Sequence, residues 1–361
     1  MPGAGHGRHR GRPSRSCAVT NDVLHKIMNA TPTSRRAFLG SAAATLATLA
    51  APRSLFAAEA AAPIVAKTRN AFSYHFAIGD VEAWSISDGH MVFKDGLNLM
   101  WPEADRAAMR ADLVAHSERT DALPLYVNIL VVKSGNEIAI FDSGYGRGRN
   151  PDIGWTGDAL AQAGIAPEKV TAAFLSHAHA DHIGGFVAEN KPVFPNAALY
   201  TLKSEVDFWR SPEPDFSHSK RAKGPLPNMI KDARNKFDVL QPNLQLLKGG
   251  ESLLGGAISI LPAPGHTNGH SVFRIKSGQE SLLHFMDVAH HHTLMFTNPA
   301  WGIAFDHEPE QATDTRKKLW AEMAAKNERA YGFHLPWPGI GRVVKRGTGY
   351  AWEQERWSWG S

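Results

Sequence analysis

The chain has 361 residues, of which 43% are hydrophobic and 20% are charged, a composition typical of a globular protein and not of a disordered one. Residues 1–60 hold 8 of the 39 Lys and Arg and 2 of the 35 Asp and Glu, so the rest of the chain holds 31 basic and 33 acidic residues. The net charge of +4 therefore belongs to the N-terminal segment, and the body has no basic bias with which to bind nucleic acid.

The N-terminal segment is predicted to direct export. Arg35 and Arg36 precede an apolar run over residues 42–51, and small residues that a signal peptidase could cleave follow at 57–62. This order resembles a bacterial twin-arginine signal, which implies the twin-arginine export machinery as a partner and a periplasmic or secreted protein. A Sec signal and a short membrane anchor are the alternatives. The run is too short and too rich in alanine for a good spanning helix, so we expect no membrane span in the mature protein.

The boundaries of this leader follow from its composition. Residues 1–27 are rich in Arg and Gly and lack apolar periodicity, so we expect Met28 to be the true start. Residues 1–60 are then an extension plus the signal, and residues 61–361 form a single domain. The only cysteine, Cys17, lies in the extension. A metal site in the mature protein would therefore use His, Asp and Glu.

Strands and helices alternate through the body, and two hairpins are predicted within it. This pattern predicts an α/β (α+β) fold with mixed sheets that are covered by helices. The predicted elements are a strand and turn at 81–89, a hairpin at 126–144, a helix at 157–165, a strand at 170–177, a strand and helix at 196–210, a loop or lid at 211–228, three strands within 257–287, a helix at 308–330, and a strand, turn and strand at 331–344.

The sequence FLSHAHADHIGG, residues 174–185, places three histidines and an aspartate directly after an apolar run. His177 and His179 are two residues apart, so in an extended segment they point to the same side. Asp181 and His182 follow in a tight turn that can direct them to a second ion. Imidazole nitrogen and carboxylate oxygen are the ligands that zinc takes without thiolates. The motif therefore predicts ligands for two adjacent metal ions.

Three further ligand candidates follow predicted strands. His266 comes after a strand and a Pro-Gly turn, Asp287 ends an apolar run, and His334 stands at another strand end. Functional side chains gather at strand ends, where a rigid scaffold meets an accessible loop. We therefore expect these residues to join the histidine motif in one site.

The complete order H-x-H-x-D-H, Gly-His, Asp and His resembles the metallo-β-lactamase superfamily over residues 75–355. The stretches FPNAALYTLKSEVDFW, PGHTNGHS and HLPWPGIGRVVKRGTGYAW are similar to the methyl parathion hydrolase branch. The resemblance implies an αββα sandwich, two mixed β-sheets flanked by helices, with the site at one edge. It also implies that one metal takes His177, His179 and His266, the other takes Asp181, His182 and His334, and Asp287 bridges them. Met286 departs from the family, which usually has glycine there.

The activity that the resemblance implies is hydrolysis by a hydroxide that bridges two divalent metal ions. Zinc is the first expectation, and Mn²⁺, Co²⁺ and Fe²⁺ are alternatives because His and Asp sites accept several metals. Asp181 and Asp287 are the candidate catalytic residues, with Asp181 orienting the hydroxide or shuttling a proton. Small esters and organophosphate triesters are the expected substrates. An acyl-homoserine lactonase is the main alternative, and a β-lactamase, a di-iron redox enzyme and a non-catalytic metal-binding protein are weaker ones. Relatives suggest a homodimer.

Several candidates outside the ligand set remain. Asp142 is expected to hold a ligand imidazole, with a plain turn carboxylate as the alternative. Trp209, Trp337 and His290 are candidates for the substrate pocket. The roles of the two histidines after His290 stay open. The native substrate depends on loops whose conformation the sequence does not give.

Overall fold

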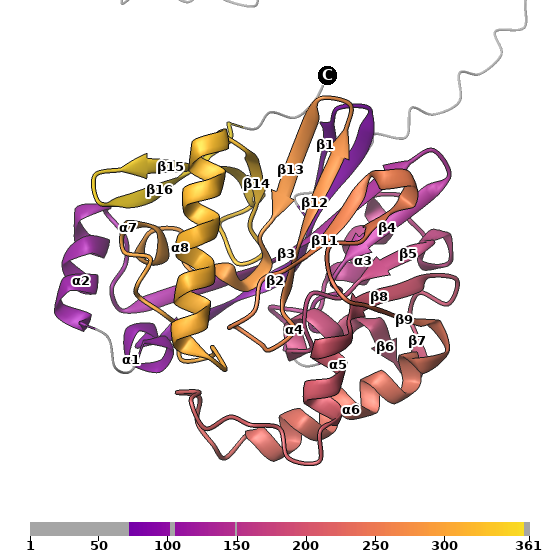
Figure 1. Cartoon of the computed structure of the whole chain (residues 1–361), viewed down its shortest axis with the longest axis horizontal. Coiled ribbons are helices and arrows are strands. Elements are labelled where there is room, and N and C mark those ends of the chain that lie inside the picture. Colours follow the sequence, from indigo (N-terminus) through magenta and orange to yellow (C-terminus); the bar gives the residue numbers. More distant parts are fainter. Residues whose placement is uncertain (1–71, 102–104, 149, 357–361) are drawn as a thin grey trace, which may run out of the picture. The chain divides into compact units, whose positions relative to one another are not determined.

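Two β-sheets of seven strands each form the centre of the computed structural model, which describes residues 72–101, 105–148 and 150–356 (Figure 1). In spatial order, the first sheet contains β1 (Ser73–Ile78), β2 (Val81–Lys94), β3 (Ala122–Ser134), β4 (Glu137–Phe141), β5 (Ala172–Phe174), β8 (Ala198–Leu202) and β9 (Leu244–Leu247). The second contains β10 (Ser252–Leu253), β11 (Ile258–Pro262), β12 (Ser271–Ser277), β13 (Glu280–His284), β14 (Arg329–Tyr331), β15 (Ile340–Arg346) and β16 (Gly349–Gln354). A small ribbon pairs β6 (Val187–Ala188) with β7 (Lys191–Pro192).

Both sheets are mixed, as predicted. The first is antiparallel from β1 to β4 and parallel from β4 through β5 and β8 to β9. The second is antiparallel apart from the β13–β14 pair. Parallel neighbours need a crossover connection, and here helices supply it.

The helices flank the two sheets. In Figure 1, α8 crosses the strands of the second sheet, while α5 and α6 lie next to β8 and β9 of the first. The helices are α1 (Gly96–Met100), α2 (Arg106–Ala115), α3 (Thr156–Gln162), α4 (Ala180–Ile183), α5 (Lys203–Arg210), α6 (Leu226–Leu240), α7 (Leu294–Thr297) and α8 (Pro309–Lys326). Short 3₁₀ turns occur at Pro167–Lys169, Gly184–Phe186, Gln241–Asn243, Leu254–Gly256 and Met286–Val288.

The sheets pack face to face through aromatic side chains. The ring of Phe273 on β12 lies 5.1 Å from that of Phe141 and 5.6 Å from that of Phe174, both in the first sheet. Its neighbour Val272 points the other way, into a second apolar cluster that includes Trp320 of α8. Successive side chains of a strand point to opposite faces of the sheet, so β12 contributes apolar side chains to the cores on both of its faces.

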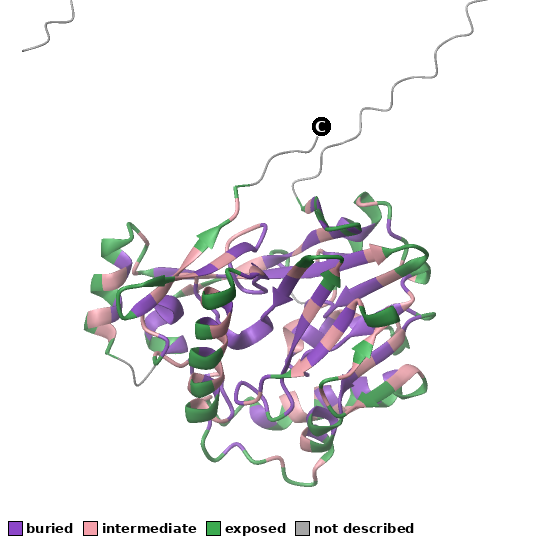
Figure 2. Ribbon diagram, turned by 45° about the horizontal axis from the view of Figure 1, so that its top comes forward, coloured by how far each residue is buried: buried purple, intermediate pink, exposed green. Residues whose placement is uncertain are grey.

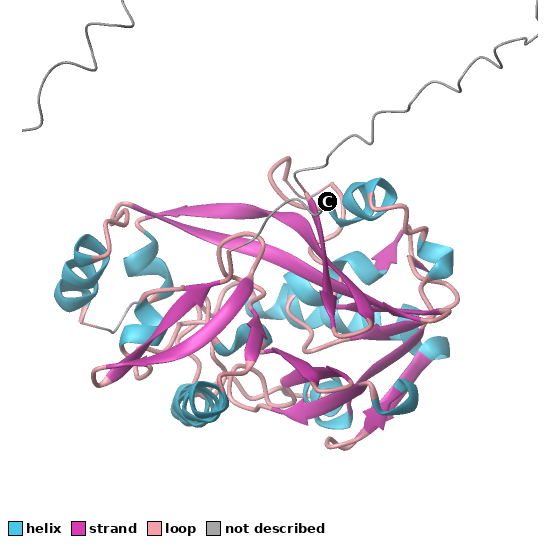
Figure 3. Ribbon diagram, turned by 90° about the horizontal axis from the view of Figure 1, so that it is seen from above, coloured by secondary structure: helices cyan, strands magenta, loops and turns pink. Residues whose placement is uncertain are grey.

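The resulting layers are helix, sheet, sheet and helix, which confirms the predicted sandwich. Strands lie in the middle and helices on both sides of them (Figure 3). Buried residues concentrate along the strands, and exposed residues lie on the outward faces of the helices (Figure 2). This arrangement brings the connections at the strand ends of both sheets to a common edge.

The structure extends one predicted strand and adds helices that the sequence did not suggest. The predicted turn at the end of 81–89 is wrong, because β2 continues to Lys94. A register shift between Ser87 and Gly89 lets the strand pass the Asp-Gly pair as a bulge. The predicted loop at 211–228 gives way to α6 at Leu226, while α1, α2 and α7 were not predicted at all.

Predictions about the leader fall on residues that the structure does not describe. The start at Met28, the twin-arginine signal and the boundary at residue 60 all lie outside the described residues. Within the described ranges, every helix is too short or too polar to cross a membrane.

Candidate metal centre

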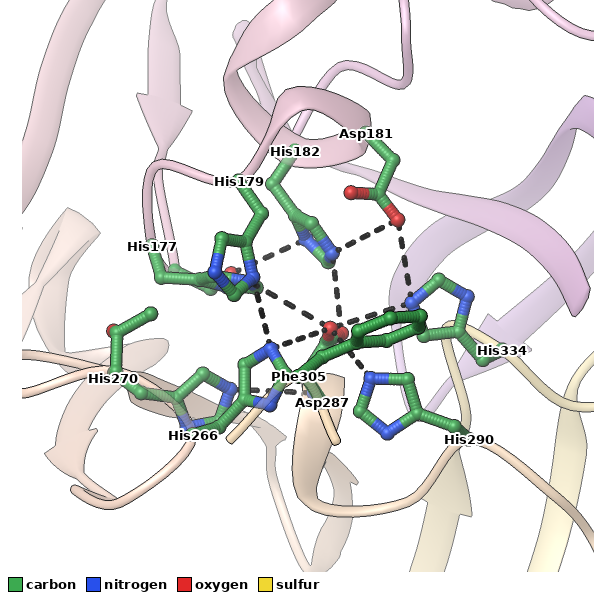
Figure 4. Close-up of polar contacts among 12 residues, drawn as sticks. His177, His179, Asp181, His182, His266, His270, Asp287, His290, Phe305 and His334 are labelled. Carbon is green, nitrogen blue, oxygen red and sulfur yellow. Dashed lines mark hydrogen bonds and ion pairs between the residues drawn. The ribbon is translucent and has the colours of Figure 1, made fainter. Parts of the chain in front are cut away.

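The predicted ligands meet at the edge where strands of both sheets end. The histidine motif covers the connection between β5 and α4 and the first residues of α4, so four ligands follow a strand of the first sheet. His266 follows β11, Asp287 follows β13 and His334 follows β14, so the second sheet brings three. Figure 4 shows these side chains converging on the carboxylate of Asp287. The structure therefore brings all seven predicted ligands together.

One ligand set consists of three histidines and Asp287, whose ligand atoms all lie within 4.8 Å of one another. His179 Nδ1 lies 2.9 Å from His177 Nε2 and 3.0 Å from His266 Nε2. Asp287 Oδ2 lies 3.2 Å from His266 Nε2 and 3.6 Å from His177 Nε2. Ligands of one tetrahedral zinc ion stand about 3.3 Å apart, so this spacing suits a single small cation.

The second set consists of Asp181, His182 and His334, again within 4.8 Å of one another. Asp181 Oδ2 lies 3.5 Å from His182 Nε2 and 3.4 Å from His334 Nε2. Asp287 contacts this set as well, with Oδ1 at 3.2 Å from His182 and Oδ2 at 3.3 Å from His334. Asp287 therefore faces both sets, as a bridging ligand must.

The donor atoms fit two divalent cations. His182 Nε2 and Asp287 Oδ1 are buried and stand 3.2 Å apart, yet neither atom forms a hydrogen bond among the described residues. A buried donor or acceptor without a partner is costly, and a bound cation would satisfy both atoms. All ligand atoms are nitrogen or oxygen, the donors of zinc sites that lack cysteine.

A buried carboxylate orients two of the histidines, as expected for Asp142. His182 Nδ1–H donates to Asp142 Oδ2 at 2.6 Å, which leaves His182 Nε2 for the metal. The Ser176 hydroxyl donates to the same oxygen at 2.6 Å and lies 2.9 Å from His177 Nδ1. Such hydrogen bonds set the tautomer and the direction of a metal-binding imidazole.

Sequence reasoning missed the equivalent partner of His266. Its Nδ1–H donates to Asp306 Oδ1 at 2.8 Å, and both side chains are buried. Arg316 of α8 lies 3.7 Å from the other oxygen of Asp306. No spacing signal identifies Asp306, since it lies in a loop 40 residues after its partner.

The family follows from the sequence over the region that carries this geometry. The family described as "Metallo-beta-lactamase superfamily" matches residues 122–334, which is more than half of the chain and spans every ligand. The chain belongs to the metallo-β-lactamase superfamily. The comparison with curated protein sequences found no match for the chain.

Several solved structures are similar to the chain. One is AidC, described as a dizinc quorum-quenching lactonase in complex with a product; it is 32% identical, the match covers 80% of this chain and all of AidC, and the TM-score is 0.76. Another is the hydrolase AbOPH, 26% identical over 80% of this chain and 99% of AbOPH, with a TM-score of 0.73. A probable metal-dependent hydrolase from Staphylococcus aureus, 17% identical over 78% of this chain and all of its own, shares the fold with a TM-score of 0.63.

The electrostatics of this metallo-β-lactamase site favour cations. Burial raises the pKa of the Asp181 carboxyl, yet His182 and His334 beside it lower that pKa to about 2. Burial lowers the pKa of His177 and His179 well below the usual value, so both imidazoles are neutral at pH 7. Ionised carboxylates beside neutral imidazoles are the protonation states that a metal ion needs.

His182 behaves differently in the metal-free protein. Burial lowers its pKa, but Asp287, Asp181 and Asp142 raise that pKa well above the usual value. A cation that binds His182 Nε2 must therefore displace a proton. Metal affinity at this set should weaken as the pH falls.

A cavity of about 160 Å³ opens on the two ligand sets. His290 is the one predicted pocket residue that lines it, and Asp287 Oδ2 lies 3.1 Å from His290 Nε2. Burial lowers the pKa of His290 to about 4 despite Asp287, so its ring is neutral. The other lining residues include apolar side chains that sequence reasoning did not single out: Met91, Phe93, Leu125 and Met229.

The two predicted tryptophans do not line this cavity. Trp209 is fully buried behind the site, where its Nε1–H donates to Glu205 at 2.6 Å and its ring lies 6.1 Å from that of His179. Trp337 packs against the core, and its carbonyl accepts a hydrogen bond from Gln354. Both adjoin ligand-bearing segments in sequence, but Trp209 is buried in the core and the partly buried Trp337 packs against that core.

Two glycines let the ligand motif approach the loop after β4. A Cβ on Gly184 would stand 2.4 Å from the carbonyl oxygen of Tyr145, and one on Gly185 would stand 2.2 Å from that of Ser143. Real Cβ atoms do not come so close to backbone, so glycine is required at both positions. The close approach also places Tyr145 at the wall of the cavity.

Proposed function

We propose that the protein is a hydrolase with two zinc ions that cleaves small esters, among which lactones and organophosphate triesters are the first substrates to test. The single observation that carries the proposal is the position of Asp287 between two complete ligand sets, beside a cavity. Membership of the superfamily and the similarity to a dizinc lactonase and to the hydrolase AbOPH support it.

Two divalent ions in such a site supply Lewis acidity and lower the pKa of a bound water from 15.7 to about 7. The residues of the chain supply the geometry. Asp287 and the buried histidines set the separation of the two sites, and Asp142 and Asp306 keep the histidine tautomers in the metal-binding form. Asp181, with 13% of its side chain exposed, stands nearest to solvent and is placed to accept or release a proton.

The cavity suits a small substrate with an apolar portion. Met91, Phe93 and Leu125 come from strands β2 and β3, Met229 comes from α6, and Phe305 comes from the loop between α7 and α8. Apolar walls exclude water, which strengthens polar interactions at the reacting bond. The volume of about 160 Å³ accommodates a short acyl or alkyl group.

A lactonase is the second candidate within the same chemistry. The dizinc lactonase AidC, whose structure contains N-hexanoyl-L-homoserine as a product, shares 32% identity with the chain. Lactone opening and ester cleavage both need a nucleophile and a cation beside the developing oxyanion. The side chains that line the cavity, and not the metal ligands, would therefore determine which of these substrates the protein prefers.

The test combines metal content with turnover. We expect two metals per chain by mass spectrometry and hydrolysis of 4-nitrophenyl acetate, paraoxon or N-hexanoyl homoserine lactone, with a cephalosporin as the comparison substrate. Asp287→Ala should lose at least one metal and more than 99% of the activity, because it removes a ligand from both sets. Exposed Asp314→Asn on α8 is the matched control. Fewer than two metals in the wild type and no turnover of any substrate would contradict the proposal.

Export and assembly are proposals that rest on the sequence. Arg35 and Arg36 support transport by the twin-arginine machinery to the periplasm or beyond. Cell fractionation of the full-length chain checks that location. A homodimer is proposed from the family resemblance alone, and sedimentation of the purified protein checks it.

A further inference from the structure

Arg221 brings a positive charge to the wall of the cavity. The residue lies in the loop between α5 and α6, and its Nη2 stands 3.2 Å from His179 Nε2 and 3.4 Å from the carbonyl oxygen of Phe305. Its guanidinium group lies 4.7 Å from the centre of the Phe305 ring. Lys223 Nζ holds the same loop by donating to the carbonyls of Phe216 and Ser219. Arg221 is therefore held in position beside the ligand sets.

His179 cannot serve as the acceptor for Arg221 once a metal is bound. His179 Nδ1 faces His177 and His266, so Nδ1 is the metal-facing atom and Nε2 carries the hydrogen of the neutral ring. That hydrogen can be donated to His307 Nε2, which lies 3.2 Å away. Arg221 Nη2 and His179 Nε2 are then both donors, and only the long contact to Phe305 remains.

The guanidinium also lacks a carboxylate partner. Within residues 72–356 as described, Arg221 forms no ion pair, and its Nε has no hydrogen-bond partner. Asp181 and Asp287 act on it through space but belong to the ligand sets, and Asp306 is bonded to His266. A metal would neutralise the first two charges. The loaded site would leave a half-buried cation with unused donors facing the cavity.

We propose that Arg221 forms an anion-binding subsite next to the metal centre and selects ligands that carry a carboxylate. The subsite rests on the proposed function as a hydrolase. A planar guanidinium binds a carboxylate through two parallel hydrogen bonds, and the Phe305 ring holds it in one plane. The carboxylate can belong to the substrate from the start, or it can be the one that ester hydrolysis releases.

Two substrates with the same leaving group separate these sources. Mono-4-nitrophenyl glutarate and 4-nitrophenyl pentanoate differ only in a carboxylate that replaces the terminal methyl group. Turnover of both is measured on the metal-loaded wild type, Arg221→Met, Arg221→Lys and the control Lys220→Met, which removes an exposed charge one residue away from the cavity. Calorimetry measures the binding of glutarate and pentanoate to the same proteins, and metal content and melting temperature are measured on each.

If Arg221 binds a carboxylate of the substrate, Arg221→Met should raise KM for the glutarate ester about tenfold or more and leave KM for the pentanoate ester unchanged. Arg221→Lys should give a KM for the glutarate ester between those of the wild type and Arg221→Met. If Arg221 instead binds the carboxylate that hydrolysis releases, Arg221→Met should keep the wild-type preference between the two esters and should bind pentanoate about tenfold more weakly. Lys220→Met should match the wild type in every arm.

Two results would overturn the subsite. One is an equal loss on both esters with unchanged binding of both acids, which indicates a general effect on His179. The other is no difference between Arg221→Met and the wild type in any arm. If the metal-loaded wild type hydrolyses neither these esters nor the triester or lactone tested above, the proposed function fails, while the binding of glutarate still decides whether Arg221 binds carboxylates.

Discussion

Two metal-facing histidines, His266 and His334, follow strands of the second sheet, and each forms a hydrogen bond through the ring nitrogen that faces away from the metal. His266 donates to Asp306, and His334 Nδ1–H donates to the carbonyl oxygen of Tyr126 at 2.7 Å. His270, outside the ligand set, accepts the backbone N–H of Asp287 through its Nε2 at 3.2 Å. The ligands are thus oriented by a layer of buried hydrogen bonds, and that layer should control how tightly metals bind.

Asp306→Asn tests this layer. The amide of asparagine lacks the negative charge that orients and polarises His266. The affinity for the metal that His177, His179 and His266 would bind should therefore fall about 10- to 100-fold. Competition with a chromophoric chelator measures the change. Asp314→Asn, an exposed residue on α8, is the matched control and should bind metal as the wild type does. Equal affinity in Asp306→Asn and the wild type would show that the contact is only structural.

At the residue scale, the sequence predicted the metal ligands, but it did not predict Asp306 and Arg221, which contact those ligands. The seven ligands stand at strand ends in a characteristic order, so pattern and spacing suffice to find them. Asp306 and Arg221 reach the site from loops 40 and 42 residues from His266 and His179, their contact partners. The conformation of such loops depends on tertiary packing that no local pattern records.

The elements around the site are joined by a cluster of polar side chains. Glu118, which follows α2, lies 3.4 Å from His291 Nε2 and 3.3 Å from His292 Nε2, and it accepts the hydroxyl hydrogen of Thr293. The backbone N–H of Thr293 donates to His291 Nδ1 at 3.1 Å. His291 Nδ1 is therefore an acceptor and its Nε2 carries the hydrogen, which favours a hydrogen-bonded cluster over a metal site.

The Glu118 cluster predicts a pH dependence of stability. Burial raises the pKa of Glu118, but His292, Thr293 and His291 lower it to about 2, against about 4.5 for the free side chain. A lowered pKa stabilises the fold above pH 4.5, and that contribution is lost as the pH falls from 4.5 towards 2. Glu118→Gln should melt at a lower temperature at pH 7 and respond less to acid over this range.

Melting curves between pH 3 and pH 7 check this prediction. The exposed Glu213→Gln is the control and should follow the wild type throughout. Parallel pH profiles for Glu118→Gln and the wild type would show that the cluster contributes nothing to stability. The same cluster answers a question that the sequence left open, because His291 and His292 connect elements while His290 lines the cavity.

Short helices mark the limit of sequence-based prediction at the element scale. The hairpins at 126–144 and 271–284 and helix α8 follow from local patterns, and the structure confirms them. α1 and α7 have five and four residues, too few to form alone, and they exist because Leu97 and Phe296 are buried in the apolar cluster that includes Trp320.

At the scale of the whole molecule, the metal centre joins the two sheets. Four ligands come from the connection after β5 in the first sheet, and three come from strand ends of the second. Metal ions bound there would hold the two halves of the sandwich together at one edge. Binding to the native state alone stabilises a protein by mass action.

Removing the metals should therefore lower the melting temperature. At a free metal concentration 1,000 times the dissociation constant, stabilisation is about 4 kcal/mol, or roughly 5–10 °C for a domain of this size. Calorimetry before and after chelation measures the shift, and added zinc should restore it. Asp287→Ala should respond much less. A melting temperature that is insensitive to chelator in the wild type would argue against a bridge between the sheets.

The residue before Asp287 adds a final consequence. Met286 has a φ of 49°, a left-handed conformation that costs a residue with a Cβ about 1–2 kcal/mol. Its side chain is completely buried, and burial of a methionine contributes about 1.5–3 kcal/mol, which offsets the strain. Glycine would adopt this bend freely, whereas here hydrophobic packing secures it. Substitutions of core residues that pack against Met286 could therefore shift the backbone at Asp287, and so change the geometry of the metal centre, without replacing any ligand.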